Sequence, residues 1–393
     1  TRSAAPFAIL DSMISATLYA LQGRSALSFE PIDVYWSEAN TLDNVGTSYF
    51  SGTYIMILGD AGVDTDEYDE SVIIHEWGHY LQTILSRDDS IGGPHGSGDL
   101  LDMRVAFSEG WANAYSGLAS NRDVYSDTSG RNQGDGFTLS LETELTTNEG
   151  GIKGWYSEDS VQYIVFDLFD QGESDDDALA LPVSAMIASM VDFMPKQAVA
   201  TSIFGFGAGV IAAQNTQTRA IMTLFNREDI GLGLTTLSVA GVGESNSAQE
   251  YTEVIDVADY TLPIFTVLDN SLISKEICQT AATNNNQRTL GVDNKLGAYR
   301  FVQFEIGTAG DYNVALITTA TPPDATGDPD FGIYNASGLV GPDPEALTFN
   351  ANSESHTLRL AKGLYWAWLH DFNNYEPGSQ SGRYCHRLEV VPQ

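Results

Sequence analysis

The sequence predicts an α+β protein in which a helix-rich N-terminal domain precedes an all-β C-terminal sandwich. Between residues 7 and 225, apolar side chains recur in several segments at the spacing of an α-helix. After about residue 257 the pattern changes to short alternating runs separated by Gly, Pro, Asn and Asp, which is typical of an antiparallel β-sandwich. A chain of 393 residues is long enough for two domains. We therefore predict one domain over residues 1–240 and a second over residues 256–393.

The composition restricts the classes of function. Hydrophobic residues make up 42% of the chain, which is enough for buried cores and excludes disorder of the whole chain. The formal net charge of −35 would repel phosphate backbones, so we do not expect nucleic acid as a partner. No apolar run approaches the roughly 18 to 20 residues of a membrane span. We expect a monomer without a membrane span, and its acidic, lysine-poor surface suggests a marine or otherwise salty environment.

The N-terminus and the cysteines bear on the location of the protein. The first four residues, Thr1 to Ala4, have neither the basic start nor the apolar stretch of a signal peptide, so we expect a cytosolic chain or one whose targeting segment has been removed. Cys278 and Cys385 lie at opposite ends of the C-terminal segment and are the only two cysteines. They favour a single disulfide over a metal site or a redox motif, with two free buried cysteines as the alternative. A disulfide in turn favours an oxidising, extracytoplasmic location.

The N-terminal domain is expected to begin with a helix over residues 7–21 and with strands over residues 32–36 and 49–58. An acidic stretch follows over residues 64–70. Because negative charge at the start of a helix complements the helix dipole, we predict a helix from about Asp69 to Ser86.

Glycines and Pro94 predict a loop over residues 92–98, and residues 121–157 are polar without a clear period. The acidic loop 173–177 is expected to be a solvated turn, with calcium binding as the alternative. Further helices are predicted over residues 101–118, 160–169, 178–194 and 198–225. The strands of the sandwich are predicted over residues 299–306, 312–318, 331–334, 357–360, 364–370 and 387–391.

A His-Glu-x-x-His motif, residues 75–79, lies on the predicted helix 69–86. One helical turn separates His75 from His79, so both imidazoles project from one face toward a single ion, and Glu76 flanks them. Zinc takes neutral nitrogen ligands and lowers the pKa of a bound water to about 7 when one position stays open. The motif therefore predicts a zinc site, with histidines packed in a core as the alternative.

The next predicted helix contains the segment Ser108-Glu109-Gly110-Trp111-Ala112-Asn113, in which Glu109 follows His79 by 30 residues. H-E-x-x-H followed by a helix with E-G-W-x-[DN] resembles the gluzincin (thermolysin-like) metallopeptidases, and the fungalysin branch in particular. The Gly-Gly-Pro loop at residues 92–94 is also similar, and the resemblance covers about residues 69–230. It implies that His75, His79 and Glu109 bind zinc and that Glu76 is the general base.

One position departs from the family pattern. Four residues after the ligand Glu the family usually has an Asp that orients the first histidine, whereas this chain has Asn113. An amide oxygen can accept the imidazole N–H but carries no charge, so it should raise the basicity of the ligand less. We expect metal binding to survive the change; an ordinary helix-surface Asn is the alternative.

Peptide hydrolysis also needs a donor to the oxyanion that forms when water attacks the scissile carbonyl. Thermolysin-like enzymes use a histidine well downstream of the ligands, but after His95 the next histidine is His356, in the predicted β-domain. The donor is therefore expected to be a tyrosine, His95 or the metal alone. Among the tyrosines the resemblance favours Tyr163, and Tyr156 and Tyr115 are weaker candidates. His95 lies in a Gly-rich loop that could close over the site or be exposed.

The resemblance places an edge strand at residues 49–58, which would pair with an extended peptide through backbone hydrogen bonds. Such pairing does not depend on side chains and suits a protein or peptide substrate. The chain lacks the G-x-M-E-N stretch of related aminopeptidases, so we favour an endopeptidase. An aminopeptidase, or a hydrolase of peptides attached to glycans, is the alternative within the same zinc class.

The C-terminal segment resembles the pre-peptidase C-terminal type of β-sandwich found on secreted bacterial proteases. The matching pieces are residues 309–312, 328–331 and 362–366. Asp324, Asp328 and Asp330 could bind calcium or be solvated turns. The whole sequence is thus interpreted as a secreted bacterial zinc endopeptidase, a hydrolase that uses Zn²⁺. The alternative from another class is an adhesin or carbohydrate-binding protein whose metal is structural; it requires four protein ligands, and the sequence offers no evident fourth.

Overall fold

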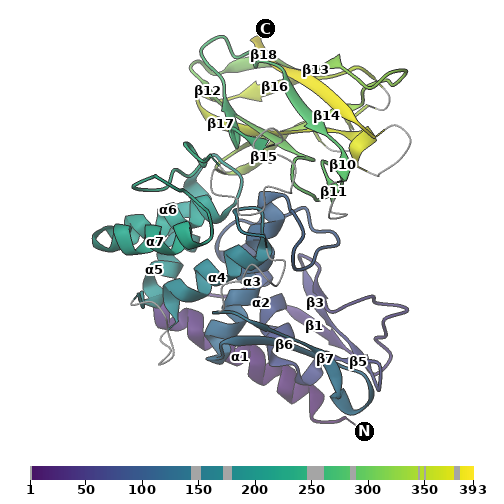
Figure 1. Cartoon of the computed structure of the whole chain (residues 1–393), viewed down its shortest axis with the longest axis vertical. Coiled ribbons are helices and arrows are strands. Elements are labelled where there is room, and N and C mark those ends of the chain that lie inside the picture. Colours follow the sequence, from purple (N-terminus) through teal and green to yellow (C-terminus); the bar gives the residue numbers. More distant parts are fainter. Residues whose placement is uncertain are drawn as a thin grey trace.

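The computed structural model describes residues 2–142, 152–170, 179–245, 261–283, 289–343, 346–348, 351–375 and 381–393. Helices and two small sheets form its lower part in Figure 1, and a β-sandwich lies above them toward the C-terminus. The mixed α+β class predicted from the sequence is therefore confirmed. The predicted domain boundary falls largely on residues 246–260, and the acidic loop 173–177 also lies outside the described residues.

The N-terminal part contains two small sheets beside three long helices. One sheet has the order β1-β3-β2 and the other has the order β4-β5-β6-β7. The helices predicted over residues 7–21, 69–86 and 101–118 are present as α1, α2 and α3 (Figure 1). The elements are α1 (Ala5–Gly23), β1 (Asp33–Trp36), β2 (Tyr49–Phe50), β3 (Tyr54–Ile57), β4 (Gly59–Asp60), β5 (Asp64–Thr65), η1 (Asp66–Tyr68), α2 (Glu70–Leu85), α3 (Met103–Ser120), β6 (Val124–Ser129), η2 (Arg131–Gln133) and β7 (Asp135–Ser140).

Two stretches of this part differ from the sequence prediction. Residues 49–58 form a hairpin of β2 and β3 instead of one strand, and Ser51 stabilises the turn by accepting hydrogen bonds from the backbone nitrogens of Thr53 and Tyr54. β3 lies in the middle of its sheet, between the edge strands β1 and β2, so within residues 49–58 only β2 is an edge strand. Residues 124–140 contain the antiparallel pair β6 and β7, where the sequence showed no period.

The remaining helices pack behind α3. The predicted helix over residues 160–169 is confirmed as α4, whereas the predicted helix 198–225 is two helices, α6 and α7, separated near Gln214. The predicted helix 178–194 starts only at Val183, after Pro182. It changes from an α-helix to a π-helix at Ala188 and to a 3-10 helix at Met194. The elements are α4 (Glu158–Phe169), α5 (Val183–Ile187), η3 (Ala188–Phe193), η4 (Met194–Lys196), α6 (Ile203–Ala213), η5 (Asn215–Gln217) and α7 (Thr218–Arg227).

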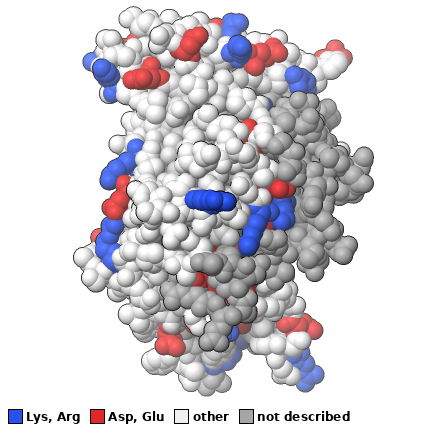
Figure 2. Space-filling model, turned by 60° about the vertical axis from the view of Figure 1, so that its left-hand side comes forward, with Lys and Arg blue, Asp and Glu red and all other residues white. Residues whose placement is uncertain are grey.

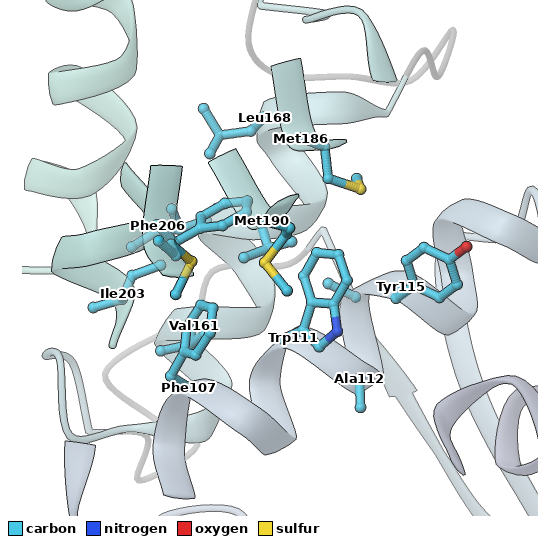
Figure 3. Close-up of a cluster of buried hydrophobic side chains, with 14 of the residues drawn as sticks. Phe107, Trp111, Ala112, Tyr115, Val161, Leu168, Met186, Met190, Ile203 and Phe206 are labelled. Carbon is cyan, nitrogen blue, oxygen red and sulfur yellow. The ribbon is translucent and has the colours of Figure 1, made fainter. Parts of the chain in front are cut away.

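A cluster of large apolar side chains holds these helices together (Figure 3). Phe206 of α6 lies between the rings of Phe107 and Trp111 of α3, with centroids 5.8 and 5.9 Å away. Met190 of η3 and Val161 of α4 are fully buried in the same cluster. Burying aromatic rings of this size contributes a few kcal/mol each, on the order of 1.5 to 3 kcal/mol per side chain. The cluster therefore fixes the position of α3, the helix that carries Glu109.

The C-terminal part is a sandwich of two sheets, with strand orders β15-β14-β17-β12-β8 and β16-β13-β18-β9. Every pairing in it is antiparallel except that of β12 with β8. All six strands predicted from the sequence are present. The elements are β8 (Phe265–Val267), β9 (Ile277–Thr280), β10 (Ala282–Thr283), β11 (Thr289–Leu290), β12 (Arg300–Ile306), β13 (Gly310–Ala320), β14 (Pro329–Asn335), β15 (Gly338–Gly341), β16 (Ser353–Leu360), β17 (Gly363–Asp371), η7 (Phe372–Asn374) and β18 (Arg383–Pro392).

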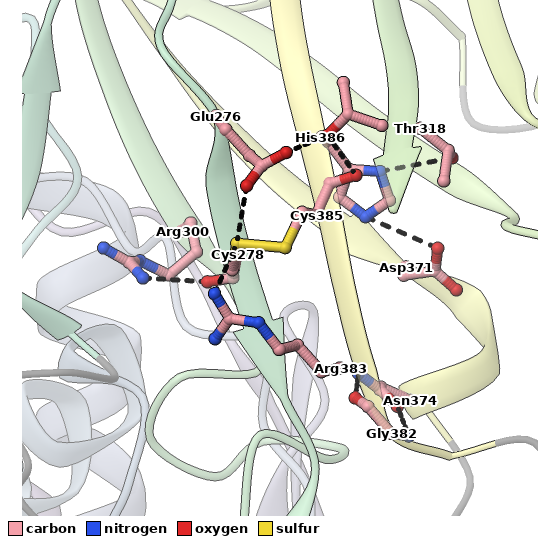
Figure 4. Close-up of a disulfide and its surroundings, with 11 residues drawn as sticks. Glu276, Cys278, Arg300, Thr318, Asp371, Asn374, Gly382, Arg383, Cys385 and His386 are labelled. Atoms are coloured by element: carbon pink, nitrogen blue, oxygen red, sulfur yellow. Dashed lines mark hydrogen bonds and ion pairs between the residues drawn. A yellow bond between two sulfur atoms is a disulfide. The ribbon is translucent and has the colours of Figure 1, made fainter. Parts of the chain in front are cut away.

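A disulfide joins Cys278 to Cys385, as predicted (Figure 4). The two cysteines lie directly opposite each other on the paired strands β9 and β18. Arg300, on β12 of the other sheet, donates to the carbonyl oxygen of Cys278 at 2.9 Å, so a hydrogen bond joins the two sheets beside the disulfide. The disulfide therefore fixes the register at which β9 joins its sheet.

Among the described residues, no helix is both long and apolar enough to cross a membrane. On the face in Figure 2, Lys and Arg side chains lie in separate places among uncharged and acidic ones.

Candidate metal centre

Helices α2 and α3 bring His75, His79 and Glu109 together. Nε2 of His75 lies 3.0 Å from Nε2 of His79, and Oε2 of Glu109 lies 3.3 Å from each of these nitrogens. The two imidazole rings are nearly perpendicular, at 82°. All three residues are largely buried. Three potential ligand atoms thus converge on one point, as the spacing of the motif predicts.

Two glycines of the sequence motifs lie where these helices approach closely. A Cβ on Gly78 would lie 3.2 Å from Cα of Ala112, and a Cβ on Gly110 would lie 2.6 Å from Cβ of Val161. Larger residues would therefore push α2 and α4 away from α3. Trp111 also donates its indole N–H to the carbonyl oxygen of Gly78 at 3.2 Å. These contacts set the distance at which Glu109 faces the two histidines.

The outer nitrogens of both imidazoles have hydrogen-bond partners. Nδ1 of His75 lies 2.8 Å from Oδ1 of Asn113, and Nδ1 of His79 lies 3.1 Å from Oγ of Ser108. The Asn113 amide nitrogen donates to Glu158, a carboxylate that can only accept, so its oxygen must face His75. His75 therefore carries a proton on Nδ1, which leaves Nε2 as the ring atom that faces Glu109 and His79. In metal sites, a hydrogen bond to the ring nitrogen that does not bind the metal usually orients the histidine in this way.

The electrostatics of the group call for a cation. Burial opposes a charge on His79, but the carboxylates of Glu109 and Glu76 outweigh it and raise the pKa of His79 to about 9. Burial likewise opposes ionisation of Glu109, yet His79 and His75 hold its pKa well below its usual value. Two imidazole nitrogens and one carboxylate oxygen are a typical donor set for zinc, so the residues present fit this metal.

Glu76 lies beside the ligands with its carboxylate buried and 7% of the residue exposed. Its Oε2 accepts a hydrogen bond from the backbone nitrogen of Phe50 at 2.7 Å. Its Oε1 accepts no hydrogen bond from any described residue, which leaves that oxygen free to bind water. The edge strand β2 thus positions Glu76 directly, a contact that the sequence alone did not indicate.

His95 lies at the same centre. Its Nδ1 is 2.9 Å from Oε2 of Glu158, and its Nε2 is 3.4 Å from Oε2 of Glu109. Burial opposes a charge on this imidazole, but Glu158 and Glu109 outweigh it and raise the pKa of His95 to about 9. The loop that carries His95 is attached to the C-terminal part, because Asn294 and Lys295 donate to the carbonyl oxygen of Pro94 at 3.2 and 2.7 Å.

The tyrosines predicted as oxyanion donors are less directly connected to the centre. Tyr115 donates its hydroxyl to the carbonyl oxygen of Ala16 at 2.6 Å, so it belongs to the contact with α1. Tyr163 and Tyr156 are buried, 5% and 2% exposed, and like His95 they are not among the residues that line the cavity beside the ligands. The role of Tyr163 stays a prediction.

Glu158 and Tyr125 are two residues of this centre that the sequence did not reveal. Glu158 connects Asn113 to His95 through its two carboxylate oxygens. The ring of Tyr125, on β6, packs edge-on against His75 with centroids 5.9 Å apart. The one available signal for Glu158 was Ser157, whose side chain accepts from the nitrogen of Ser160 and starts α4 before residue 160.

A cavity of about 360 Å³ opens beside the ligands. Its lining combines the end of β2 with α2, the loop after α2, and α3. The lining residues are Phe50, Gly52, His79, Thr83, Asp88, Ser90, Gly92, Ser108 and Glu109. A chain segment that enters this cavity would therefore pass the edge of β2 and reach the ligand atoms.

The model of the mycolysin C-terminal domain family matches residues 19–225, more than half of the chain. The chain belongs to this family. The part that matches the mycolysin C-terminal domain includes α2, α3 and α4, and with them every residue of the centre described above. This family is associated with peptidases, so the chain is a peptidase-related protein.

A search of curated proteins finds no match. Similar solved structures include the pre-peptidase C-terminal domain of collagenase from Bacillus anthracis, at 10% identity over 32% of this chain and 93% of that chain, with a TM-score of 0.19. CorA, a surface-associated copper-binding protein of Methylomicrobium album BG8, is 9% identical over 33% of this chain and 98% of its own, with a TM-score of 0.22. PliG, a periplasmic lysozyme inhibitor of Aeromonas hydrophila, is 10% identical over 33% of this chain and 96% of its own, with a TM-score of 0.18. At these TM-scores the similarities carry no argument about this chain.

Proposed function

We propose that this chain is a secreted zinc-dependent endopeptidase that hydrolyses peptide bonds within proteins. The observation that carries the proposal is the convergence of Nε2 of His75, Nε2 of His79 and Oε2 of Glu109, each 3.0 to 3.3 Å from the others. Among the described residues, these three form the group at this centre whose ligand atoms all lie within 4.8 Å of one another. Three protein ligands leave zinc a position for water, which is the arrangement of catalytic sites.

The residues around the ligands support a hydrolytic role. Zinc, when bound, supplies a Lewis acid that lowers the pKa of a water to about 7. Glu76 has its Oε2 held by the Phe50 backbone, so its Oε1 can take a proton from the attacking water and pass it to the leaving amine. His95 can donate from Nε2 to the developing oxyanion while Glu158 holds its Nδ1.

The surroundings of the centre support a protein substrate. The cavity is open beside β2, a strand at the edge of its sheet, where an extended peptide can lie. A disulfide persists in oxidising surroundings, so the Cys278–Cys385 bond supports an extracytoplasmic location.

The test is digestion of casein by the zinc-loaded protein. We expect many mid-sized fragments, loss of activity after treatment with a chelator, and recovery when zinc is returned. Release of single amino acids alone would instead identify an aminopeptidase of the same zinc class. Absence of any cleavage by a protein with zinc bound would refute peptide hydrolysis.

One observation favours a second candidate, a non-catalytic adhesin or carbohydrate-binding protein with a structural metal. Nε2 of His95 is only 3.4 Å from Oε2 of Glu109, so a small movement of the loop would make His95 a fourth ligand and close the site. In that case His95→Ala would lower the affinity for zinc. In the peptidase it would lower the rate and leave zinc bound.

A further inference from the structure

A second group of carboxylates lies before the N-terminal end of α2. It consists of Asp64 in β5, Asp66 in η1 and Asp127 in β6. One carboxylate oxygen from each residue lies within 4.8 Å of the other two. The pairing of β5 with β6 brings Asp127 to the other two residues, which lie far from it in the sequence. The fold therefore assembles this cluster.

Two buried oxygen atoms of this cluster accept no hydrogen bond from any residue that the structure describes. Asp66 is 3% exposed; its Oδ2 accepts a hydrogen bond from Ser48, but its Oδ1 has no partner. Oδ1 of Asp64 is likewise buried and accepts no hydrogen bond from the described residues. The carboxyl groups of Asp64 and Asp66 lie so close that, without a cation, they can bond to each other only by sharing a proton. Buried carboxylate oxygens without a donor are costly, on the order of 1 to 3 kcal/mol each or more. A bound group that attracts these oxygens would remove this cost.

No basic side chain neutralises the cluster within the described part of the chain. The neighbouring arginines, Arg2 and Arg122, form ion pairs with Glu67 and Glu70 instead. Burial, with the nearby carboxylates, raises the pKa of Asp66 to about 8 and that of Asp127 to about 6. The cluster therefore favours either protons or a cation at neutral pH.

The atoms of the cluster suit a hard cation. Calcium takes six to eight oxygen ligands from carboxylates, amides, backbone carbonyls and water, whereas zinc prefers nitrogen and sulfur. Gln133 adds a neutral oxygen next to Thr65, because its Nε2 donates to the carbonyl oxygen of Thr65 at 2.7 Å while its buried Oε1 has no partner among the described residues. We propose that Asp64, Asp66 and Asp127 bind a calcium ion, with the amide oxygen of Gln133 beside them.

This calcium ion connects β6 to the start of the helix that carries the zinc motif. Asp66 is separated from α2 by only a short turn, and Asp127 lies two residues after Tyr125, which packs on His75. The same two segments are already joined by Thr128, whose backbone nitrogen donates to Asp69 at 2.8 Å. Calcium therefore stabilises the packing of β6 against His75, whether or not the chain is a peptidase.

The test is calcium binding and thermal unfolding of the full-length, zinc-loaded protein, transferred into calcium-free buffer without a chelator. Calcium chloride alone is the probe, followed by isothermal titration calorimetry and by the melting temperature. We expect Tm to rise by roughly 3 to 5 °C for each tenfold excess of calcium over its Kd. Asp66→Asn should abolish this rise and remove one binding event. Because it relieves repulsion between carboxylates, its Tm without calcium should equal or exceed that of the wild type.

Two further variants keep the test decisive. Asp127→Asn changes a less buried ligand, so it serves if Asp66→Asn does not fold, and it should also lose the binding event. Asp311→Asn removes the same charge from an exposed site in the sandwich, where Asp311 pairs with Arg359, and should bind calcium as the wild type does. The proposal is wrong if the wild type shows no calcium-dependent rise in Tm, or if Asp66→Asn or Asp127→Asn binds as many calcium ions as the wild type.

Discussion

The amide nitrogen of Asn113 donates a hydrogen bond to Oε1 of Glu158 at 2.8 Å. The same side chain presents its oxygen to His75 at 2.8 Å. An Asp at position 113 would place two carboxylates in contact and lose the donor to Glu158. An amide at position 113 therefore suits the presence of Glu158, whereas the metallopeptidases that the sequence motifs resemble usually have a carboxylate there.

Exchanging the amide of Asn113 and the carboxylate of Glu158 tests this relationship. Asn113→Asp should lower zinc affinity by about 10- to 100-fold, because the repelled carboxylates no longer hold His75 in place. Combining it with Glu158→Gln restores a donor opposite the new carboxylate, and zinc affinity should recover. Competition with a chromophoric chelator measures both variants. Equal affinity of the single and double variants would mean that Glu158 does not act through residue 113.

Glu76→Gln tests the role of the general base. The amide can still accept a hydrogen bond from the Phe50 nitrogen but cannot take a proton from water. We expect kcat on casein to fall by roughly 10²- to 10⁴-fold, with zinc content unchanged by atomic absorption. Full activity, or loss of the metal, would rule out the assigned role.

His95→Ala and Tyr163→Phe form a matched pair for the oxyanion donor. Nε2 of His95 lies 3.4 Å from Oε2 of Glu109, and Glu158 holds its Nδ1 at 2.9 Å, whereas Tyr163 is buried on α4 and 5% exposed. We expect His95→Ala to lower kcat by about 10²- to 10³-fold with little change in KM, and Tyr163→Phe to stay near the wild type. The reverse result would assign the donor to Tyr163.

The motifs predicted this centre because they fix local geometry. The i, i+4 spacing of His75 and His79 places both rings on one helix face in any helical context. By contrast, Ser108 contacts His79 only because α3 packs at a particular distance from α2, and Glu158 contacts His95 only because α4 begins beside the loop 92–98, so no local pattern indicates them. The same reasoning covers Phe50, whose backbone nitrogen reaches Glu76 across a sheet edge.

The fold was predictable where one face of an element is buried. A strand such as β16 alternates between buried and more exposed residues because only one of its sides faces the core, whereas β7 is exposed along most of its length and shows no alternation in the sequence. The acidic stretch 64–70 was interpreted through the helix dipole. In the structure α2 begins at Glu70, next to the predicted Asp69, so this helix start is confirmed. Asp64 and Asp66, however, lie beside Asp127 of β6, and that cluster depends on the pairing of β5 with β6.

The buried His370 predicts a dependence of stability on pH. Burial, with the charge of Arg104 and the nearby His386, lowers the pKa of His370 to about 3. The folded state therefore keeps this imidazole neutral while the unfolded chain takes up a proton below about pH 6.5, so stability is lost as the pH falls from 6.5. The loss should be up to about 1.4 kcal/mol per pH unit.

Denaturant unfolding at several values between pH 7 and pH 5 measures this effect. His370→Phe keeps a ring against Tyr299, which stacks on His370 at 4.7 Å, but cannot titrate. The unfolding free energy of this variant should fall less steeply with acidification than that of the wild type. The difference in slope should correspond to the uptake of about one proton on unfolding. Parallel curves for the two proteins would mean that His370 titrates normally in the folded state.

Removal of the disulfide should destabilise the sandwich. Cys278 and Cys385 are separated by 107 residues, and closing so long a loop is worth up to about 4 to 5 kcal/mol in the chain-entropy model. Cys278→Ser combined with Cys385→Ser should shift the denaturant midpoint to lower concentration, and reduction of the wild type should do the same. An unchanged midpoint in both would show that the strand pairing alone determines the stability.

The most direct measurement of the zinc centre is an anomalous-scattering map at the zinc edge, from crystals of the zinc-loaded protein. We expect one strong peak about 2.0 to 2.2 Å from Nε2 of His75, Nε2 of His79 and the carboxylate of Glu109. A peak elsewhere, or a Glu109 carboxylate turned away from the metal, would contradict the account.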